Sequence, residues 1–161
     1  MNWIIRHSDK MEFHTHLNIL LNPILDDIAE FNWLISNFEY HPDYAKDLPV
    51  NHDEEYFILS SVNFKKMIHA DPQIIWAVIL GIPQGKSIEI DEDNLPYADG
   101  SAIVWKNGNL QHPNAVMEII CFDSSYTIVK FKDEKLSTKF KAYFNEAIGL
   151  EKFSNDSAPN Y

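Results

Sequence analysis

The sequence predicts an α+β fold in a single domain: a largely antiparallel sheet of six to seven strands, two longer helices and one short helix. The chain has 161 residues, of which 45% are hydrophobic and 13% aromatic, so it can bury one substantial core. Residues 74–80 are consecutive apolar residues, which is typical of a strand buried on both faces. Strand-like segments follow one another without regular helical crossovers, and this favours antiparallel pairing.

The segment before residue 31 is expected to hold a short strand, at residues 3–6, and one of the longer helices. Apolar residues recur at helical spacing and predict a helix over 15–29. They are Leu17, Leu20, Leu21, Ile24, Leu25 and Ile28. Pro23 interrupts this pattern. In the alternative, Asn22 caps a helix that begins at Pro23, and residues 13–21 alternate as a strand.

Two strands and the short helix are predicted between residues 31 and 72. Residues 31–36 and 56–60 have the composition of strands, and we expect them to pair. A long polar loop over 39–55, with several Asp and Glu residues, separates them. Ser61 is expected to cap the helix. The core-facing residues of that helix are Phe64, Met67 and Ile68.

Four further strands are predicted after the central one. Alternation of polar and apolar residues predicts a half-exposed strand at 87–91. An acidic loop at 91–100 follows, and we expect a further strand at 102–105. Residues 116–122 and 126–131 are expected to form an antiparallel hairpin.

The last predicted helix begins after Asp133, which is a good N-cap, and stops at Gly149. Its apolar residues at helical spacing are Leu136, Phe140, Tyr143, Phe144 and Ala147. Because the residues after it are polar, we place the domain at 1–153 and a polar tail at 154–161.

The charge balance bears on the class of partner. Asp and Glu number 24 against 13 Lys and Arg, which gives a net charge of −11. Such a chain is repelled by nucleic acid and by anionic membranes, so we expect it to bind neither of them independently of sequence. No apolar run approaches the roughly 18 residues of a membrane span, and no signal peptide is visible. We therefore expect a soluble cytoplasmic protein.

Residues 81–87 resemble a phosphate-binding loop at first sight, because a strand runs into Gly81, Gly85, Lys86 and Ser87. That motif needs four residues between its glycines, whereas three stand here, and Pro83 is one of them. It must also open a helix, but the next residues alternate like a strand. The sequence therefore favours the turn of a central hairpin over a nucleotide site.

Two other groups of residues carry weaker chemical signals. His14 and His16 lie on one face if their segment is a strand, and with His41 or His52 nearby they could bind a divalent metal. Their spacing matches no zinc motif, so we expect exposed histidines and assign no metal or cofactor. The single cysteine, Cys121, lies in an apolar strand, where we expect an inert buried thiol and not a nucleophile.

The two acidic loops are the candidate binding surface. If both project from the same edge of the sheet, they form a negative patch that can steer a basic partner. Tyrosines near them, Tyr40, Tyr44 and Tyr97, and the nearby Trp105 are candidate aromatic anchors. The candidate partner-binding residues are Asp47, Asp53, Glu54, Glu55, Asp91, Glu92, Asp93, Tyr97 and Asp99. The alternative is an ordinary solvated acidic surface.

Three stretches together resemble small acidic bacterial domains of unassigned function, among them the immunity proteins of polymorphic toxin systems. They are Phe-Asn-Trp-Leu-Ile at 31–35, the central strand, and Cys-Phe-Asp-Ser-Ser-Tyr at 121–126 with the helix that follows. The resemblance implies a non-catalytic, single-domain protein that masks a toxin through an acidic face.

The function expected from the sequence is therefore binding of a basic protein through the acidic loops, without catalysis. The alternative is a small enzyme or ligand-binding domain with a pocket beside the central sheet.

Overall fold

The computed structural model describes residues 1–42 and 47–157. In this part of the chain seven strands form one sheet, in the order β3-β2-β4-β5-β6-β1-β7, and all neighbours are antiparallel. The strands are β1 (Asn2–Ile5), β2 (Phe31–Tyr40), β3 (Tyr56–Leu59), β4 (Ile74–Pro83), β5 (Met117–Phe122), β6 (Tyr126–Phe131) and β7 (Ile148–Gly149). The helices are α1 (Leu17–Leu20), α2 (Ser61–Ala70), α3 (Glu134–Tyr143) and α4 (Leu150–Ser157), with short 3-10 helices η1 (Asn22–Ile24) and η2 (Glu92–Asn94). The predicted α+β class is confirmed.

The central strand β4 is buried on both faces, as its apolar run predicts. It pairs with β2 on one side and with β5 on the other. The predicted hairpin partner at 87–91 is wrong, because that segment is not a strand. Instead the chain turns at Gly85, where φ is +85°, and runs through an irregular connection at 84–116 before it returns as β5.

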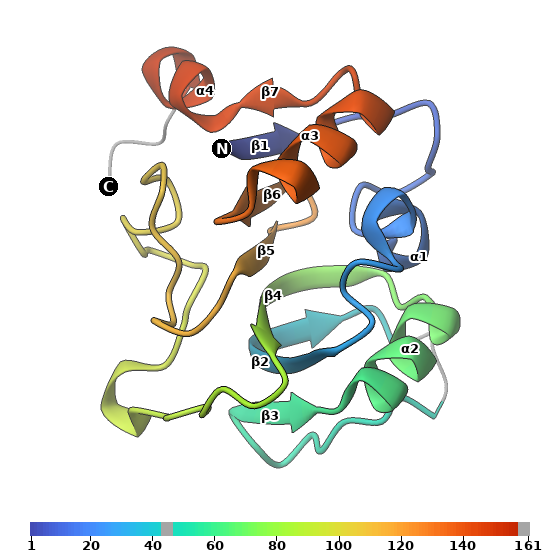
Figure 1. Ribbon diagram of the computed structural model, residues 1–161, viewed down its shortest axis with the longest axis vertical. Coiled ribbons are helices and arrows are strands. Elements are labelled where there is room, and N and C mark those ends of the chain that lie inside the picture. Colours follow the sequence, from blue (N-terminus) through green and yellow to red (C-terminus); the bar gives the residue numbers. More distant parts are fainter. Residues whose placement is uncertain (43–46, 158–161) are drawn as a thin grey trace.

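The two faces of the sheet are covered by different kinds of structure (Figure 1). One face, which we call the helical face, packs its apolar side chains, such as Ile79 and Ile119, against α1, η1, α2 and α3. The other, the loop face, packs side chains such as Leu80 and Ile120 against the 84–116 connection and α4. The sheet is therefore the middle layer of the molecule.

Two oppositely charged side chains lie fully buried on the loop face. Glu118 of β5 and Lys130 of β6 are cross-strand neighbours. Glu118 accepts hydrogen bonds from the backbone and side-chain nitrogens of Gln111, at 3.0 and 2.9 Å. Lys130 Nζ donates to the carbonyls of Ile103 and Asn109, both at 3.0 Å. The pair thus ties the irregular connection to the sheet.

The predicted helix at 15–29 is wrong. Only α1 and the single turn η1, which contains Pro23, are helical there. The proline has no N–H to donate and its ring clashes with the preceding turn, so it disfavours a helix that continues through this position. The apolar pattern still predicts burial correctly, because Leu17, Leu20, Leu21 and Ile24 all lie in the core. The periodicity identified the buried residues but not the backbone that presents them.

Three further predictions need correction. Residues 102–105 form turns and not a strand, although Val104 is buried on the loop face. Ser60, not Ser61, caps α2, with its hydroxyl accepting from the Asn63 N–H at 3.3 Å. The helix predicted to stop at Gly149, α3, ends at Tyr143, and Gly149 lies in β7.

The end of the described chain is helical. Helix α4 includes residues 154–157, which the sequence suggested were part of a polar tail, and residues 158–161 lie outside the described part. By contrast, the β5–β6 hairpin and the Asp133 cap of α3 are confirmed.

Candidate functional site: an acidic cleft

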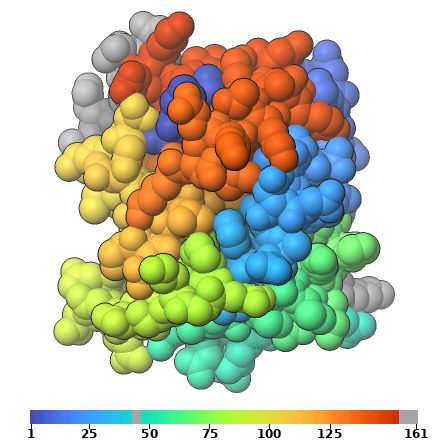
Figure 2. Space-filling model, in the orientation of Figure 1, coloured from blue at the N-terminus to red at the C-terminus, as the bar shows by residue number. Residues whose placement is uncertain are grey.

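The two acidic loops lie next to each other at the β3 edge of the sheet. In Figure 2 the segment with residues 91–100 lies beside the chain that leads into β3, at the lower end of the view. Together with β2 these segments enclose a cleft of about 750 Å³. Its charged lining consists of five carboxylates, from Glu39, Glu54, Glu55, Glu92 and Asp93, and no Lys or Arg is among the described residues that line it. We call this the acidic cleft.

A β-bulge in β2 shapes the base of the cleft. The pairing of β2 with β4 shifts register between Ser36 and Glu39, and Asn37 adopts a left-handed backbone conformation with φ of 50°. Asparagine tolerates this region better than most residues, and bulges re-aim the side chains beside them. Asn37 Oδ1 accepts a hydrogen bond from the Ala98 N–H at 3.0 Å. The bulge therefore connects β2 to the loop that follows β4.

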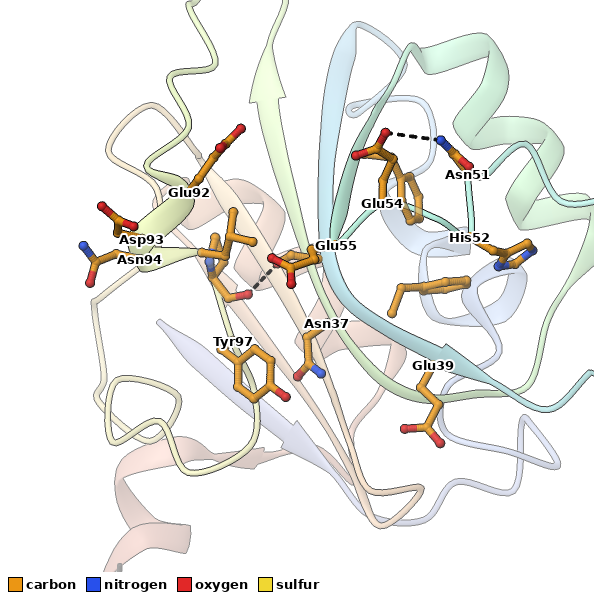
Figure 3. A pocket seen from close by; sticks show the side chains of 15 residues that line it. Asn37, Glu39, Asn51, His52, Glu54, Glu55, Glu92, Asp93, Asn94 and Tyr97 are labelled. Atoms are coloured by element: carbon orange, nitrogen blue, oxygen red, sulfur yellow. Dashed lines mark hydrogen bonds between the residues drawn. The ribbon is translucent and has the colours of Figure 1, made fainter.

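One wall of the cleft is the segment before β3. Asn51 Oδ1 accepts from the Asp53 N–H at 3.2 Å and forms a local turn. The His52 ring stacks on Tyr40, with centroids 5.7 Å apart. Figure 3 shows Glu54 and His52 on this side of the cleft, and Glu55 between the two walls.

The opposite wall is the 3-10 turn η2. Asp91 caps it, because its carboxylate accepts from the Asp93 N–H at 3.2 Å and from Asn94 Nδ2 at 2.8 Å. Tyr56 of β3 connects the walls by donating its hydroxyl to Glu92 Oε1 at 3.4 Å. Loss of hydration, and then the negative charges of Glu92 and Glu54, raise the pKa of Tyr56 above its ordinary value. The tyrosine therefore stays a neutral hydrogen-bond donor.

Apolar surface accompanies the carboxylates. Phe38 and Phe57 meet edge to face in the lining, with centroids 5.6 Å apart. Tyr97 is 49% exposed and lies at the cleft near Asn37 (Figure 3). A site of this kind offers aromatic contact and negative charge together, which suits cationic groups.

The candidate partner-binding residues fall into two groups. Glu54, Glu55, Glu92, Asp93 and Tyr97 line the cleft. The other four do not line it, and they are Asp47, Asp53, Asp91 and Asp99, all exposed.

Glu39 and the amides of Asn37 and Asn51 also line the cleft but were not selected from the sequence. The signal for Glu39 was its position at the start of the polar loop. Because β2 continues through the bulge to Tyr40, Glu39 belongs to the strand that forms the base.

The remaining aromatic candidates have different environments. Trp105 packs on the loop face against Phe122 and Phe153, with centroids 5.2 and 5.9 Å away, so it is not part of the cleft. Tyr40 contacts His52, as described above. Tyr44 lies outside the described residues.

The histidine candidates are engaged separately. His14 Nδ1 lies 2.9 Å from Thr127 Oγ1 and its Nε2 lies 2.7 Å from the Ser124 carbonyl. His16 Nδ1 lies 3.0 Å from the carboxylate of Asp71, at the end of α2. Within residues 1–42 and 47–157 no group of three or more His, Cys, Asp or Glu residues is arranged to hold a metal ion.

Cys121 is fully buried, and burial raises the pKa of its thiol to about 12. The thiolate is therefore not formed near neutral pH, which agrees with an inert core cysteine.

No helix in the described part of the chain is long and apolar enough to cross a membrane. No family model, no curated protein and no solved structure significantly matches this chain. What can be said of its class thus rests on its own geometry: an α+β domain with an acidic cleft at one edge of its sheet.

Proposed function

We propose that this chain is a non-catalytic cytoplasmic binding domain that engages a basic protein through the acidic cleft. The observation that carries the proposal is the convergence of five carboxylates from three chain segments on one cleft, with no Lys or Arg among the described lining residues. The resemblance of the sequence to immunity proteins of polymorphic toxin systems supports a role in masking a toxin.

Repulsion among the cleft carboxylates favours a binding role over an ordinary solvated acidic surface. Carboxylates that share a cleft repel one another and reduce the stability of the fold, and a cationic group between them relieves this repulsion. The aromatic lining adds contact area of the kind that dominates binding energy at protein interfaces. The attraction of a basic partner to these exposed groups is screened over about 8 Å at physiological salt, so complex formation should be faster at low ionic strength.

The test compares two triple variants with equal loss of charge. The cleft variant carries Glu54→Gln, Glu55→Gln and Glu92→Gln, and the control carries Glu12→Gln, Asp26→Asn and Glu30→Gln at exposed positions outside the cleft. A partner captured from the native host by the wild-type chain is identified, purified and titrated by calorimetry. We expect the cleft variant to bind at least about tenfold more weakly, a loss of roughly 1.4 kcal/mol, and the control to bind like the wild type. Equal binding by all three proteins would sink the proposal.

The size of the cleft supports a second candidate function, binding of a small cationic ligand. Its volume of about 750 Å³ lies within the usual range for ligand sites. The probes are spermidine, choline and arginine methyl ester in thermal-shift titrations. A saturable rise in melting temperature that the cleft variant loses and the control keeps would favour this candidate. Absence of any saturable shift excludes these ligands.

A further inference from the structure

The backbone of the cleft wall is held at three consecutive residues. The Pro96 carbonyl accepts from Ser36 Oγ at 2.5 Å, the Tyr97 N–H donates to Gln111 Oε1 at 2.9 Å, and the Ala98 N–H donates to Asn37 Oδ1 at 3.0 Å. Pro96 and Ala98 are buried, while the Tyr97 side chain between them is 49% exposed. The Tyr97 ring therefore projects from a backbone segment that three hydrogen bonds hold in place.

Gln111 has its own support, in the core. Its Nε2 donates to Glu118 Oε1 at 2.9 Å, and its backbone N–H donates to Glu118 Oε2 at 3.0 Å. With Nε2 bound to the carboxylate, the amide oxygen is the atom left to face the Tyr97 N–H. The orientation of the amide is thus set by Glu118, a fully buried residue of β5.

Glu118 is a costly residue at this position. Loss of hydration raises its pKa, and the positive charge of Lys130 and the bonds from Gln111 act in the opposite direction. Replacing a buried charge pair by apolar side chains is often neutral or stabilising. The presence of Glu118 and Lys130 in the core is therefore not explained by a gain in the free energy of unfolding. What the charged pair supplies, and an apolar pair does not, is four directed hydrogen bonds to residues 103–111.

We propose that Gln111 and Glu118 are positioning residues of the acidic cleft, with Glu118 orienting Gln111 and Gln111 fixing the Tyr97 backbone, so that the Tyr97 ring is an ordered anchor for the partner. The role of Tyr97 as an anchor for the partner rests on the proposed function. The ordering of the Tyr97 backbone by Gln111 and Glu118 does not depend on it. Preorganised anchors lower the entropic cost of binding, and this gain appears mainly in the dissociation rate.

The first arm of the test needs no partner. Gln111→Met removes the side-chain acceptor and donor at similar size, and Gln84→Met is the control at an exposed position in the same connection. Amide hydrogen exchange is followed by NMR. In Gln111→Met we expect Tyr97 to exchange about tenfold faster or more, while Ile119 in β5 keeps its rate. Unchanged exchange at Tyr97 overturns the proposal whatever the partner does.

A second variant removes the hydrogen bonds of Glu118 and Lys130 without leaving an unpaired buried charge, so it separates loss of these bonds from loss of folding. Glu118→Leu with Lys130→Met keeps the loop face apolar and removes all four bonds to the connection. We expect the sheet amides to stay protected and the Tyr97 and Gln111 amides to exchange faster. Protection of both amides at wild-type level in this variant also overturns the proposal.

The third arm is a double-mutant cycle with the purified partner. If Gln111 acts through Tyr97, Gln111→Met raises the dissociation rate several-fold in the wild type and has no effect in a Tyr97→Ala background. A merely structural role for Gln111 predicts equal effects in both backgrounds, and equal effects overturn the anchoring role. If the cleft triple variant binds normally while Tyr97 exchange still responds to Gln111→Met, the proposed function has failed and the ordering of the wall stands.

Discussion

The segments that cover the helical face and the loop face of the sheet satisfy their backbone hydrogen bonds in different ways. Helices bond their own backbone, so the helical face can be almost entirely apolar, and even its cysteine is an inert buried thiol. The irregular connection on the loop face bonds its own backbone only at separate turns, since it has no regular ladder. There the sheet supplies charged side chains, Glu118 and Lys130, for that purpose.

Buried His112 extends the same contrast within the connection itself. Its Nε2 lies 3.1 Å from the Glu89 carbonyl, and its Nδ1 accepts from the Asn114 N–H at 3.1 Å. A long irregular segment can therefore serve as a layer of the fold when buried polar side chains replace the missing backbone partners. That same polar support continues to Tyr97 at the acidic cleft.

The largest effect is expected on the loop face. Lys130→Met leaves Glu118 buried without a compensating charge and removes the hydrogen bonds that Lys130 donates to two carbonyls of the connection. We expect a loss of about 3–5 kcal/mol in the free energy of unfolding, measured by urea denaturation.

The control for this prediction is the double variant Glu118→Leu with Lys130→Met, which removes both charges. It should recover most of the lost free energy, because no unpaired charge remains in the core. An equal loss in the single and double variants would show that the carbonyl contacts, and not charge compensation, dominate.

A smaller effect is expected from overpacking the helical face. A Cβ at Gly81 would lie 2.9 Å from Phe31 Cδ2 and 3.2 Å from the Trp33 ring. Gly81→Ala should therefore cost about 1–3 kcal/mol by urea denaturation. Gly149→Ala, where a Cβ meets nothing within 4 Å, is the control and should change stability little. A cost below that of the control would mean that the two rings move aside freely.

The smallest effect is a pH dependence from His14, which binds the β5–β6 turn from the helical side. Burial lowers its pKa below the ordinary 6.5, against the opposing effect of the hydrogen bond to Ser124. The unfolded chain thus binds the proton more readily. The contribution of neutral His14 to the stability of the fold is therefore full above about pH 6.5. It falls as the pH drops through the lower pKa that His14 has in the folded state.

This predicts a melting temperature that decreases between pH 7.5 and 5.5 more in the wild type than in His14→Gln. His7→Gln removes an exposed histidine and is the control, with the wild-type slope expected. Parallel curves for all three proteins would remove His14 as a source of the pH dependence.

The sequence predicted those parts of the fold that depend on local signals. The β5–β6 hairpin has two strongly apolar strands around a short turn, and Asp133 caps α3 through bonds to Lys135 and Leu136 two and three residues away. It failed where tertiary packing decides. Residues 87–91 alternate like a strand, but β5 occupies the edge of β4 that a hairpin partner would need. Residues 102–105 are all apolar like a strand, but they form turns that pack Val104 on the loop face.

The candidate site was predictable in its carboxylates and not in its frame. Two loops rich in Asp and Glu are visible in the sequence, whereas their meeting depends on the bulge at Asn37, which has no clear sequence signal. Gln111 and Glu118 were missed for a related reason. A glutamate between apolar residues of a strand gives no sign that its partner is a glutamine seven residues earlier, in an irregular connection.

The position of β1 has a consequence for synthesis of the chain. β1 is made more than a hundred residues before its neighbours in the sheet, β6 and β7, which lie at residues 126–149. At roughly 5–20 residues per second a ribosome takes on the order of 10 seconds to reach them. During that interval Ile4 and Ile5, both fully or nearly fully buried in the finished fold, have no strand to pair with. The nascent chain can pair β2, β3 and β4 first, so completion of the sheet waits for translation and not for the pairing itself.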